Sequence, residues 1–520
     1  MRLRSALTAL PFLVPAAAHA QGDGSGEAGT ALGAAALTAA LKDYLGPLPF
    51  KDGFVTIEPD PKGYRITLAA KGSFSTALPG GGRAETNVSP YSLVVSQRSD
   101  GNWQVNGDGA VAFSYGLDVD GGKVDTDYAI NGIEFAGIWA TDIRSFLTST
   151  GTIDGMQMSQ AQPNGDVRAE FGPMRIQSTS QPKQDGIVDY SLSQVVDGFT
   201  ETIRTALDPA QPDKFIDIVF SAGAYTVTTD AADLQARPIT DLAAFLLRKA
   251  GDDTLRQSEP ELKRLIGEAM PLWSRIAGDT SLDDIAVKTP FGTAAIGRLD
   301  LALSGDGIVT DGTYRYRFAA SGMTYDFPQI PGWAKPLIPS DMTMDVVGAG
   351  IDLETPARIM ISRLDLSTDE PLSEEAGREI LATFEEKRPR LRLENVRLAA
   401  RDYDVTVDGE ITFDAAKPET RFDIVATGLD AALKSLQDAG AEDPQALQGF
   451  AFGSMAKGFG RQIADGKTQW VIETAADGSV KINGVTIKGP DAPSVEPQPS
   501  PEIEPAPLAP EGDDGAGQPL

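Results

Sequence analysis

The sequence predicts an α+β fold built mainly from antiparallel β-sheet, with helical pairs packed against the sheet. Three observations support this class. Long stretches alternate apolar and polar residues, Asp-Gly turn signals recur between them, and only a few segments have helical spacing. Alternation buries one face of each strand, which is typical of antiparallel rather than parallel sheet.

Residues 110–130 contain the clearest predicted β-hairpin. Val111 and Phe113 begin an alternating run, Asp120 to Gly122 supply turn residues, and alternation resumes at Val124. Further Asp-Gly turn signals begin at residues 100, 306, 311, 408 and 477. These signals divide the middle of the chain into many short predicted strands.

Six segments have the apolar spacing expected of helices. They cover residues 31–45, 191–207, 241–250, 259–277, 372–386 and 431–438. In the second segment, Val195, Phe199, Ile203 and Leu207 recur every four residues, which predicts one buried helix face. Helices are therefore expected to be a minority of the fold.

Two parts of the chain repeat the order strand, helix, helix, hairpin. KFIDIVF (214–220) resembles RFDIVAT (421–427), and the segments at 241–253 and 262–278 correspond to those at 429–443 and 447–466. Alternating segments at 282–303 and 468–487 then follow. We interpret this order as an internal duplication. The alternative is a coincidental likeness between two α+β segments.

The same patterns predict the organisation of the chain. We expect a signal peptide (1–20), a flexible mature N-terminus (21–30) and an N-terminal β-rich region (31–210). A first repeat (211–303), a β-rich connector (304–390), a second repeat (391–488) and a disordered acidic Pro-rich tail (489–520) follow. The tail is rich in Pro, Glu and Asp, a composition that cannot bury enough apolar surface to fold.

The first twenty residues have the features of a cleaved secretory signal. Arg2 and Arg4 precede an apolar run at 6–18, and Ala18-His19-Ala20 forms a small-x-small cleavage pattern. We therefore expect a soluble periplasmic protein, because no later segment is long and apolar enough to span a membrane. Cleavage removes two arginines and no acid, which takes the formal net charge from −29 to −31.

His19 is the only histidine, and the chain contains no cysteine. The mature chain therefore lacks the residues for a Ser-His-Asp triad, a cysteine nucleophile or a His/Cys zinc site. The strong negative charge opposes binding to nucleic acid, which depends on lysine and arginine. No GxxxxGK[ST] loop is present, and we expect no cofactor.

Carboxylates remain as possible chemical groups. A glycosidase-type pair requires two facing acids, and nothing in the sequence singles out such a pair, so a hydrolase is a remote alternative. Asp118, Asp120, Asp125 and Asp127 are candidates for calcium binding, but their spacing departs from an EF-hand. Acids on the outward face of a hairpin explain them more simply.

Two apolar segments are candidates for ligand binding. The first is the proline-rich segment 327–342, whose prolines disfavour a central strand, and the second is the glycine-containing segment 449–460. Either segment could line a lipid groove or cover a sheet end as core. The candidate contacts with an apolar ligand are Phe327, Ile330, Trp333, Leu337, Phe450, Phe452, Met455 and Phe459.

Residues 395–440, followed by DGSVKINGVTIKGPDAP (477–493), form a strand, Gly turn, strand and Leu-x-Ala-Leu helix. This pattern resembles the domain of unknown function 2125 family of alphaproteobacterial envelopes, over roughly 390 to 490 and more loosely upstream. The resemblance implies an envelope protein with a repeated β-rich fold, and no catalytic residues.

The pattern is also similar in style to AsmA-like envelope proteins, which are associated with lipid handling. Those proteins usually begin with a transmembrane anchor, whereas this sequence begins with the predicted signal peptide. This departure weakens any carry-over of a bridging role from them.

We therefore expect a non-enzymatic envelope protein that binds an apolar ligand such as lipid, or assists envelope assembly. The alternative is an interaction or structural protein whose acidic proline-rich tail binds an envelope protein. A lipid-binding role requires a continuous apolar groove lined by strands. An interaction role predicts instead a filled core with an exposed apolar patch.

Overall fold

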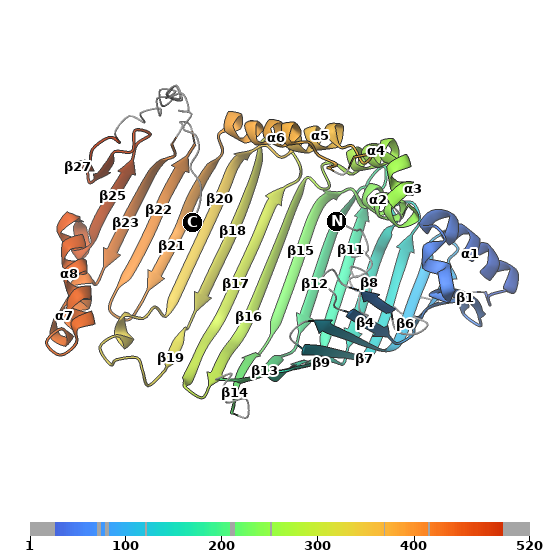
Figure 1. The fold of residues 1–520 in the computed structure, drawn as a ribbon, viewed down its shortest axis with the longest axis horizontal. Helices are drawn as coiled ribbons and strands as arrows, with labels where there is room; N and C mark the ends of the chain where they lie inside the picture. Colours follow the sequence, from blue (N-terminus) through green and yellow to red (C-terminus); the bar gives the residue numbers. More distant parts are fainter. Residues whose placement is uncertain are drawn as a thin grey trace, which may run out of the picture.

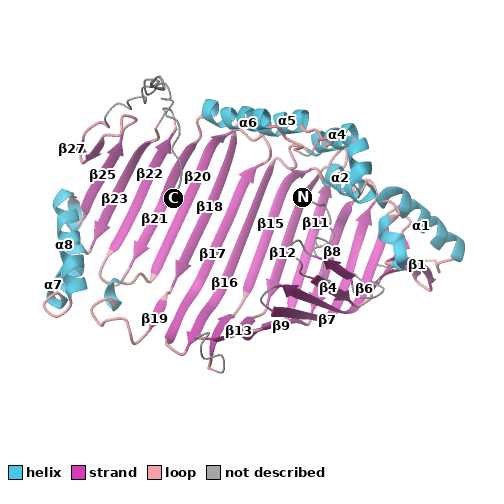
Figure 2. Cartoon of the chain, viewed as in Figure 1, coloured by secondary structure: helices cyan, strands magenta, loops and turns pink. Residues whose placement is uncertain are grey.

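The computed structural model describes residues 27–69, 74–77, 83–119, 122–207, 214–249, 252–368, 370–413 and 417–491. The predicted signal peptide and the predicted acidic tail beyond residue 491 lie outside this part of the chain. The described strands belong to one 27-stranded sheet in which every pairing is antiparallel (Figures 1 and 2). The expected α+β class with dominant antiparallel sheet is confirmed at this level.

The N-terminal strands end in the hairpin expected around residue 120. Val111 in its first strand lies opposite Ile130 in its second. The strands are β1 (Val55–Asp60), β2 (Gly63–Leu68), β3 (Phe74–Ala77), β4 (Arg83–Val88), β5 (Tyr91–Gln97), β6 (Trp103–Val119) and β7 (Gly122–Ala140). Both β4 and β5 pair with β6, along different halves of its length.

The middle of the chain continues this meander. Its strands are bent or interrupted at corresponding positions along their length. They are β8 (Ser145–Ile153), β9 (Gly155–Gln162), β10 (Gly165–Phe171), β11 (Met174–Pro182), β12 (Val188–Val196), β13 (Phe199–Ala206), β14 (Phe215–Ala222), β15 (Tyr225–Leu234), β16 (Arg275–Thr289), β17 (Gly292–Asp306), β18 (Gly312–Ser321) and β19 (Thr324–Asp326). Because β8 and β9 both pair with β7, they act as two halves of one long strand.

The interruptions align into a crease that crosses the sheet perpendicular to the strands. Its residues are Ala110, Asn131–Gly132, Asp154, Gly172–Pro173, Asp197–Gly198, Gly223–Ala224, Asp284, Gly297 and Gly322–Met323. Backbone hydrogen bonds still connect neighbouring strands there, as from Gly172 N–H to Gly198 C=O. Gly132 has φ of 61° and Asp284 has φ of 52°, the left-handed conformation found in many β-bulges.

The crease divides the sheet into two parts. We call the smaller part the flap; it contains β3, β4, β9, β10, β13, β14, β19 and the adjoining ends of β6, β7, β16 and β17. We call the larger part the main wall. In Figure 1 the flap strands β4 and β9 lie at the lower right, nearer the viewer than the main wall, while β13, β14 and β19 lie along the lower edge.

The main wall continues beyond the crease to the C-terminal edge. Its strands there are β20 (Asp341–Ile351), β21 (Arg390–Ala399), β22 (Asp404–Thr412), β23 (Glu419–Thr427), β24 (Arg461–Gln462), β25 (Thr468–Thr474), β26 (Val480–Ile482) and β27 (Val485–Lys488). The expected boundaries near residues 303 and 390 fall within β17 and at the start of β21, so the sheet is continuous across them.

The helices lie around the rim of the sheet (Figures 1 and 2). Within the described part of the chain, one helix occupies the N-terminal end, five helices follow the upper edge in Figure 1, and two occupy the C-terminal end. They are α1 (Ala31–Leu45), α2 (Ala236–Arg248), α3 (Asp252–Gln257), α4 (Glu259–Ala269), α5 (Glu354–Arg363), α6 (Glu374–Lys387), α7 (Leu429–Ala439) and α8 (Pro444–Phe459), with 3₁₀ turns η2 (Leu48–Gly53), η3 (Lys335–Leu337) and η4 (Ala464–Gly466).

The helix predicted at 191–207 is wrong, because this segment forms most of β12 and all of β13, joined at Asp197–Gly198. A four-residue repeat is compatible with a helix. It is also compatible with a strand, because residues separated by an even number of positions lie on the same face of a strand. Phe199 and Ile203 therefore share one face of β13 as well. The helix predicted at 259–277 is too long: α4 ends at Ala269, Pro271 follows, and β16 begins at Arg275.

The buried core is concentrated in the N-terminal half and under the helices. Tyr91, Ile133 and Ile153 form a cluster at the crease, and Phe245, Leu262 and Leu265 form another between α2 and α4. The buried hydrophobic residues of the C-terminal half are mostly alanines such as Ala399 and Ala426. Much of the main wall is consequently a single layer whose larger apolar side chains are only half-buried.

Candidate apolar trough

An unbroken row of directly opposing residues crosses one face of the main wall. Opposing residues in antiparallel strands point to the same face, so the register alone defines this row. It runs Ile66, Leu93, Gly107, Phe135, Gly151, Ile176, Gln194, Val227, Thr280, Leu301, Phe318 and Met344. We call this the inner face of the main wall.

The inner face continues to the C-terminal edge of the sheet. A second row begins one pair further along the strands, at Leu303 opposite Tyr316, and both of these side chains are exposed. It continues through Val346, Leu393, Gly409, Phe422, Ile472 and Ile482. The register thus gives the main-wall strands β17, β18, β20, β21, β22, β23, β25 and β26 a common, largely apolar face.

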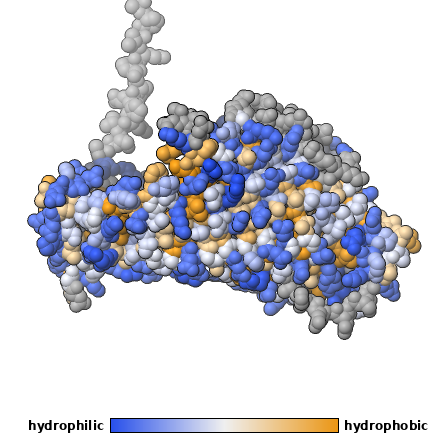
Figure 3. Space-filling model, turned by 90° about the horizontal axis from the view of Figure 1, so that it is seen from below, coloured by the Kyte–Doolittle hydropathy of each residue, from blue (hydrophilic) through white to orange (hydrophobic). Residues whose placement is uncertain are grey.

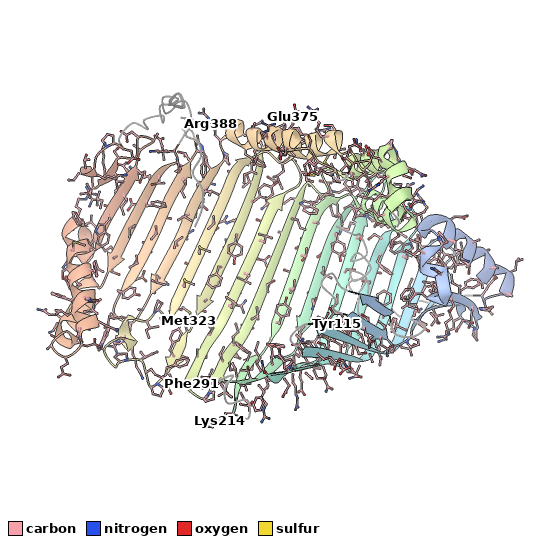
Figure 4. The ribbon with its side chains drawn as sticks, viewed as in Figure 1. Tyr115, Lys214, Phe291, Met323, Glu375 and Arg388 are labelled. Atoms are coloured by element: carbon pink, nitrogen blue, oxygen red, sulfur yellow. The ribbon has the colours of Figure 1, made fainter. Side chains whose placement is uncertain are left out.

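The flap has an inner face of the same character. Its row runs Phe113, Tyr128, Met158, Ala169, Glu201, Phe220, Val287, Ala294 and Tyr325. The rings of Phe113 and Tyr128 stack with centroids 4.9 Å apart. Figure 4 labels Tyr115 on the flap part of β6, two residues along the same face from Phe113. One member of this row, Glu201, carries a charge.

The inner faces of the flap and main wall meet on the same side of the sheet. Val111 and Ile130, from the flap side of the crease, pack against the cluster of Tyr91, Ile133 and Ile153 on the main wall. At the crease the strands other than β6 shift their alternation by one residue, so their apolar side chains stay on one side. The two faces therefore meet as one apolar surface along the crease, and we call this surface the trough.

The size of this trough follows from the sheet geometry. The crease runs from β5 to β18, and ten strands of the main wall border it. With neighbouring strands about 4.8 Å apart, its length is roughly 45 Å. Figure 3 shows hydrophobic residues gathered near the middle of the molecule and bordered by hydrophilic residues.

Helices close against the inner face at both ends. At the N-terminal end, Leu37 of α1 packs on the cluster of Val95, Val105 and Phe135. At the C-terminal end, the indole Nε1 of Trp470 donates a hydrogen bond to the carbonyl of Ala456 in α8, at 2.7 Å. The strands between these helices carry the most exposed part of the inner face.

The opposite face of the main wall is polar and rich in ion pairs. Arg298 contacts Asp283 and Asp300, and Arg315 contacts Asp345 and Glu394. Asp345 is buried, and its hydrogen bond with Arg315 lowers the pKa of the Asp345 carboxyl. The charged residues of the strands thus pair with one another away from the trough.

The structure places the first predicted set of contacts at the lower edge of the main wall. Phe327, Ile330, Trp333 and Leu337 are half-buried in the loop after β19 and in η3. The Leu337 carbonyl accepts a hydrogen bond from the Tyr403 hydroxyl at 3.1 Å. Residues 327–340 of this proline-rich segment lie outside the sheet, and β20 begins at Asp341.

The second predicted set lies on α8. Phe450 is half-buried, whereas Phe452, Met455 and Phe459 are exposed. The two sets are connected, because Trp333 Nε1 donates to the Asp443 carboxylate, and Asp443 caps α8 through the Gln445 N–H. Both sets thus border the C-terminal end of the inner face.

Sequence reasoning missed the residues that line most of the trough. Leu301, Leu303, Tyr316, Phe318 and Met344 were not among the candidate ligand contacts, although they lie in alternating segments. The alternation showed that these strands have an apolar face. The missing information was the register, which places one or two residues from each strand in a common row.

The candidate calcium site is only partly within the described chain. Asp120 and the side chain of Asp118 lie outside it, while Asp125 forms an ion pair with Lys123 at 2.9 Å. Among the described residues, no group of three or more His, Cys, Asp or Glu side chains could hold a metal ion.

Comparisons with known proteins identify no relative of this chain. No model of a known protein family matches this chain, and no curated protein or solved structure matches it significantly. None of the described helices combines the length and the apolar character needed to cross a membrane.

Proposed function

We propose that this protein binds an apolar ligand, with lipid acyl chains as the ligand class, along the trough. The observation that carries the proposal is the continuous apolar inner face, which stays open in the middle of the sheet. Leu303 is 61% exposed at that place, and its neighbour Tyr316 is also exposed. Large apolar surfaces of this kind usually mark a binding site.

The energetics of an acyl chain suit such a surface. Each CH₂ group removed from water contributes about 0.8 kcal/mol, so a chain of about 15 carbons contributes on the order of 10 kcal/mol before binding costs. Little opposes this on the inner rows, because nearly all their residues are uncharged. The net charge of −29 resides largely elsewhere and does not prevent the binding of an apolar chain.

The carboxyl groups favour a binding protein over a hydrolase. A general acid requires a raised pKa. Wherever a carboxyl pKa shifts in the described chain, it is lowered, as at Asp345 beside Arg315 and at Asp189 beside Lys183. We therefore propose a non-enzymatic role.

Three finer assignments belong to the same proposal: location in the periplasm, membership of the domain of unknown function 2125 family, and descent by internal duplication. Support for duplication comes from topology. Helices α2–α4 are inserted between the paired strands β15 and β16, and α7–α8 between the paired strands β23 and β25. In each place a group of helices, three in the first and two in the second, follows a strand and precedes the strand that pairs with it.

Native mass spectrometry tests the binding function directly. The secreted protein, purified without detergent, should carry a stoichiometric lipid that organic extraction of the same sample identifies. An apo mass that stays unchanged after exposure to membranes would contradict the proposal.

A further inference from the structure

Helix α8 is apolar on both of its sides, although only one side is packed. On the packed side, Gly449 and Gly453 face Leu436 and Leu433 of α7, where an added Cβ would lie 3.2 and 2.7 Å from them, respectively. The other side presents Leu447, Phe452, Met455 and Phe459, all exposed. A helix that is apolar all round is normally buried on all sides, whereas half the surface of α8 has no partner among the residues that the structure describes.

The exposed side chains of α8 share one side of the helix. At 100° per residue, Leu447, Phe452, Met455 and Phe459 fall within an arc of about 140°. Phe452 is 68% exposed and Met455 is 58% exposed, so both project into solvent.

The neighbouring edge strand extends this surface. Asn483, in the turn before β27, donates its side-chain amide to the Phe459 carbonyl at 2.9 Å. The exposed residues Val485 and Ile487 follow on β27. We call these two residues, with Leu447, Phe452, Met455 and Phe459, the end patch.

The charge around the end patch differs from that of the whole chain because it is nearly balanced. Residues 444–488 contain five Lys or Arg and three Asp or Glu, whereas the full sequence has 45 and 74. Two of these cations are paired with acids just outside this range, Lys457 with Asp430 and Lys488 with Asp491. Repulsion from an anionic bilayer is therefore weaker at the end patch than over the rest of this acidic protein.

The end patch is also continuous with the trough. Trp470 on the inner face hydrogen-bonds to α8, and Val485 lies opposite Ile482, the last member of the inner row. We propose that the end patch docks on the surface of a lipid bilayer, so that the C-terminal end of the trough opens towards the membrane. This inference rests on the proposed function, because it makes the bilayer the source or destination of the bound lipid.

Vesicle flotation of the full secreted chain tests the docking. The probe is vesicles of phosphatidylethanolamine and phosphatidylglycerol in equal amounts. The double variant F452S/M455S should reduce the vesicle-bound fraction about tenfold or more, because both side chains leave the apolar interface. The matched control is L381S, which removes a 66% exposed leucine from α6. It should bind vesicles like the parent protein.

Thermal unfolding and lipid extraction separate a loss of docking from a loss of folding or of ligand binding. Thermal unfolding should be unchanged in both variants, since the replaced side chains are exposed. Equal flotation of F452S/M455S and the parent overturns the docking. So does a loss of self-association or of a protein complex without a loss of flotation, because it assigns the patch to a second copy or a protein partner. Lipid extracted from the parent protein reports separately on the trough: its presence supports the binding function even if docking fails.

Discussion

Replacing Leu303 by glutamate places a charge in the middle of the proposed binding surface. Fully burying a leucine side chain contributes about 1.5–3 kcal/mol, and 61% of this side chain is still exposed. A ligand that covers it therefore gains about 1–2 kcal/mol from this residue. The glutamate loses that gain and adds the cost of desolvating a carboxylate, at least about 1 kcal/mol. The total of about 2–3 kcal/mol predicts a loss of affinity of roughly 30- to 150-fold.

The assay is an equilibrium titration with a fluorescent fatty acid whose emission rises in apolar surroundings. Ser304→Glu is the matched control, because Ser304 is the next residue of β17 and points to the outer face, opposite Arg315. The control should retain the affinity of the parent, and both variants should fold. Parent-like binding by Leu303→Glu, or an equal loss in both variants, would refute a ligand site on the inner face.

Two further predictions concern the sheet itself. Asp345→Asn should lower the free energy of unfolding at neutral pH by about 2 kcal/mol, less than for a fully buried ion pair because Arg315 is partly exposed and keeps Glu394. Since the folded-state pKa of Asp345 is lowered, its contribution is present above the unfolded pKa near 3.9 and lost as pH falls through the folded value. Denaturant titrations should therefore show the variant approaching the parent below about pH 4, and parallel curves would contradict this. Gly172→Ala should lower the free energy of unfolding by about 2 kcal/mol or more, because its Cβ would lie 1.8 Å from the backbone oxygen of Asp197. The control is Gly332→Ala, whose Cβ would meet nothing within 4 Å. Equal melting temperatures of the two variants would contradict close backbone packing at the crease.

Much of the local structure could be predicted from the sequence. Alternation identified antiparallel strands and the hairpin around residue 120, and the helices at 31–45, 372–386 and 431–438 agree closely with α1, α6 and α7. The error at 191–207 has a physical cause. A repeat of four is shared by helix and strand, and Gly198 was the only local sign of an interruption.

The crease could not be predicted in the same way. The left-handed conformations of Gly132 and Asp284 become meaningful only when the neighbouring strands bend at the same level. Single-sequence patterns contain no information about that alignment. The prediction of ligand contacts was limited in the same way. Aromatic residues crowded into 327–342 and 449–460 can be seen in the sequence, whereas Leu301 and Phe318 become neighbours only through the register of β17 and β18.

The single-layer main wall gives a physical reason to connect ligand binding with stability. On its outer face, pairs such as Arg298 with Asp300 satisfy the charges without a second layer. On its inner face, Leu303 and Tyr316 lack such a cover. A ligand that binds only the folded state stabilises it by RT ln(1 + [L]/Kd), which is about 2.7 kcal/mol at a hundredfold excess over Kd. An acyl chain along the trough would therefore act as part of the missing core, and removal of lipid should lower the melting temperature of the parent more than that of Leu303→Glu.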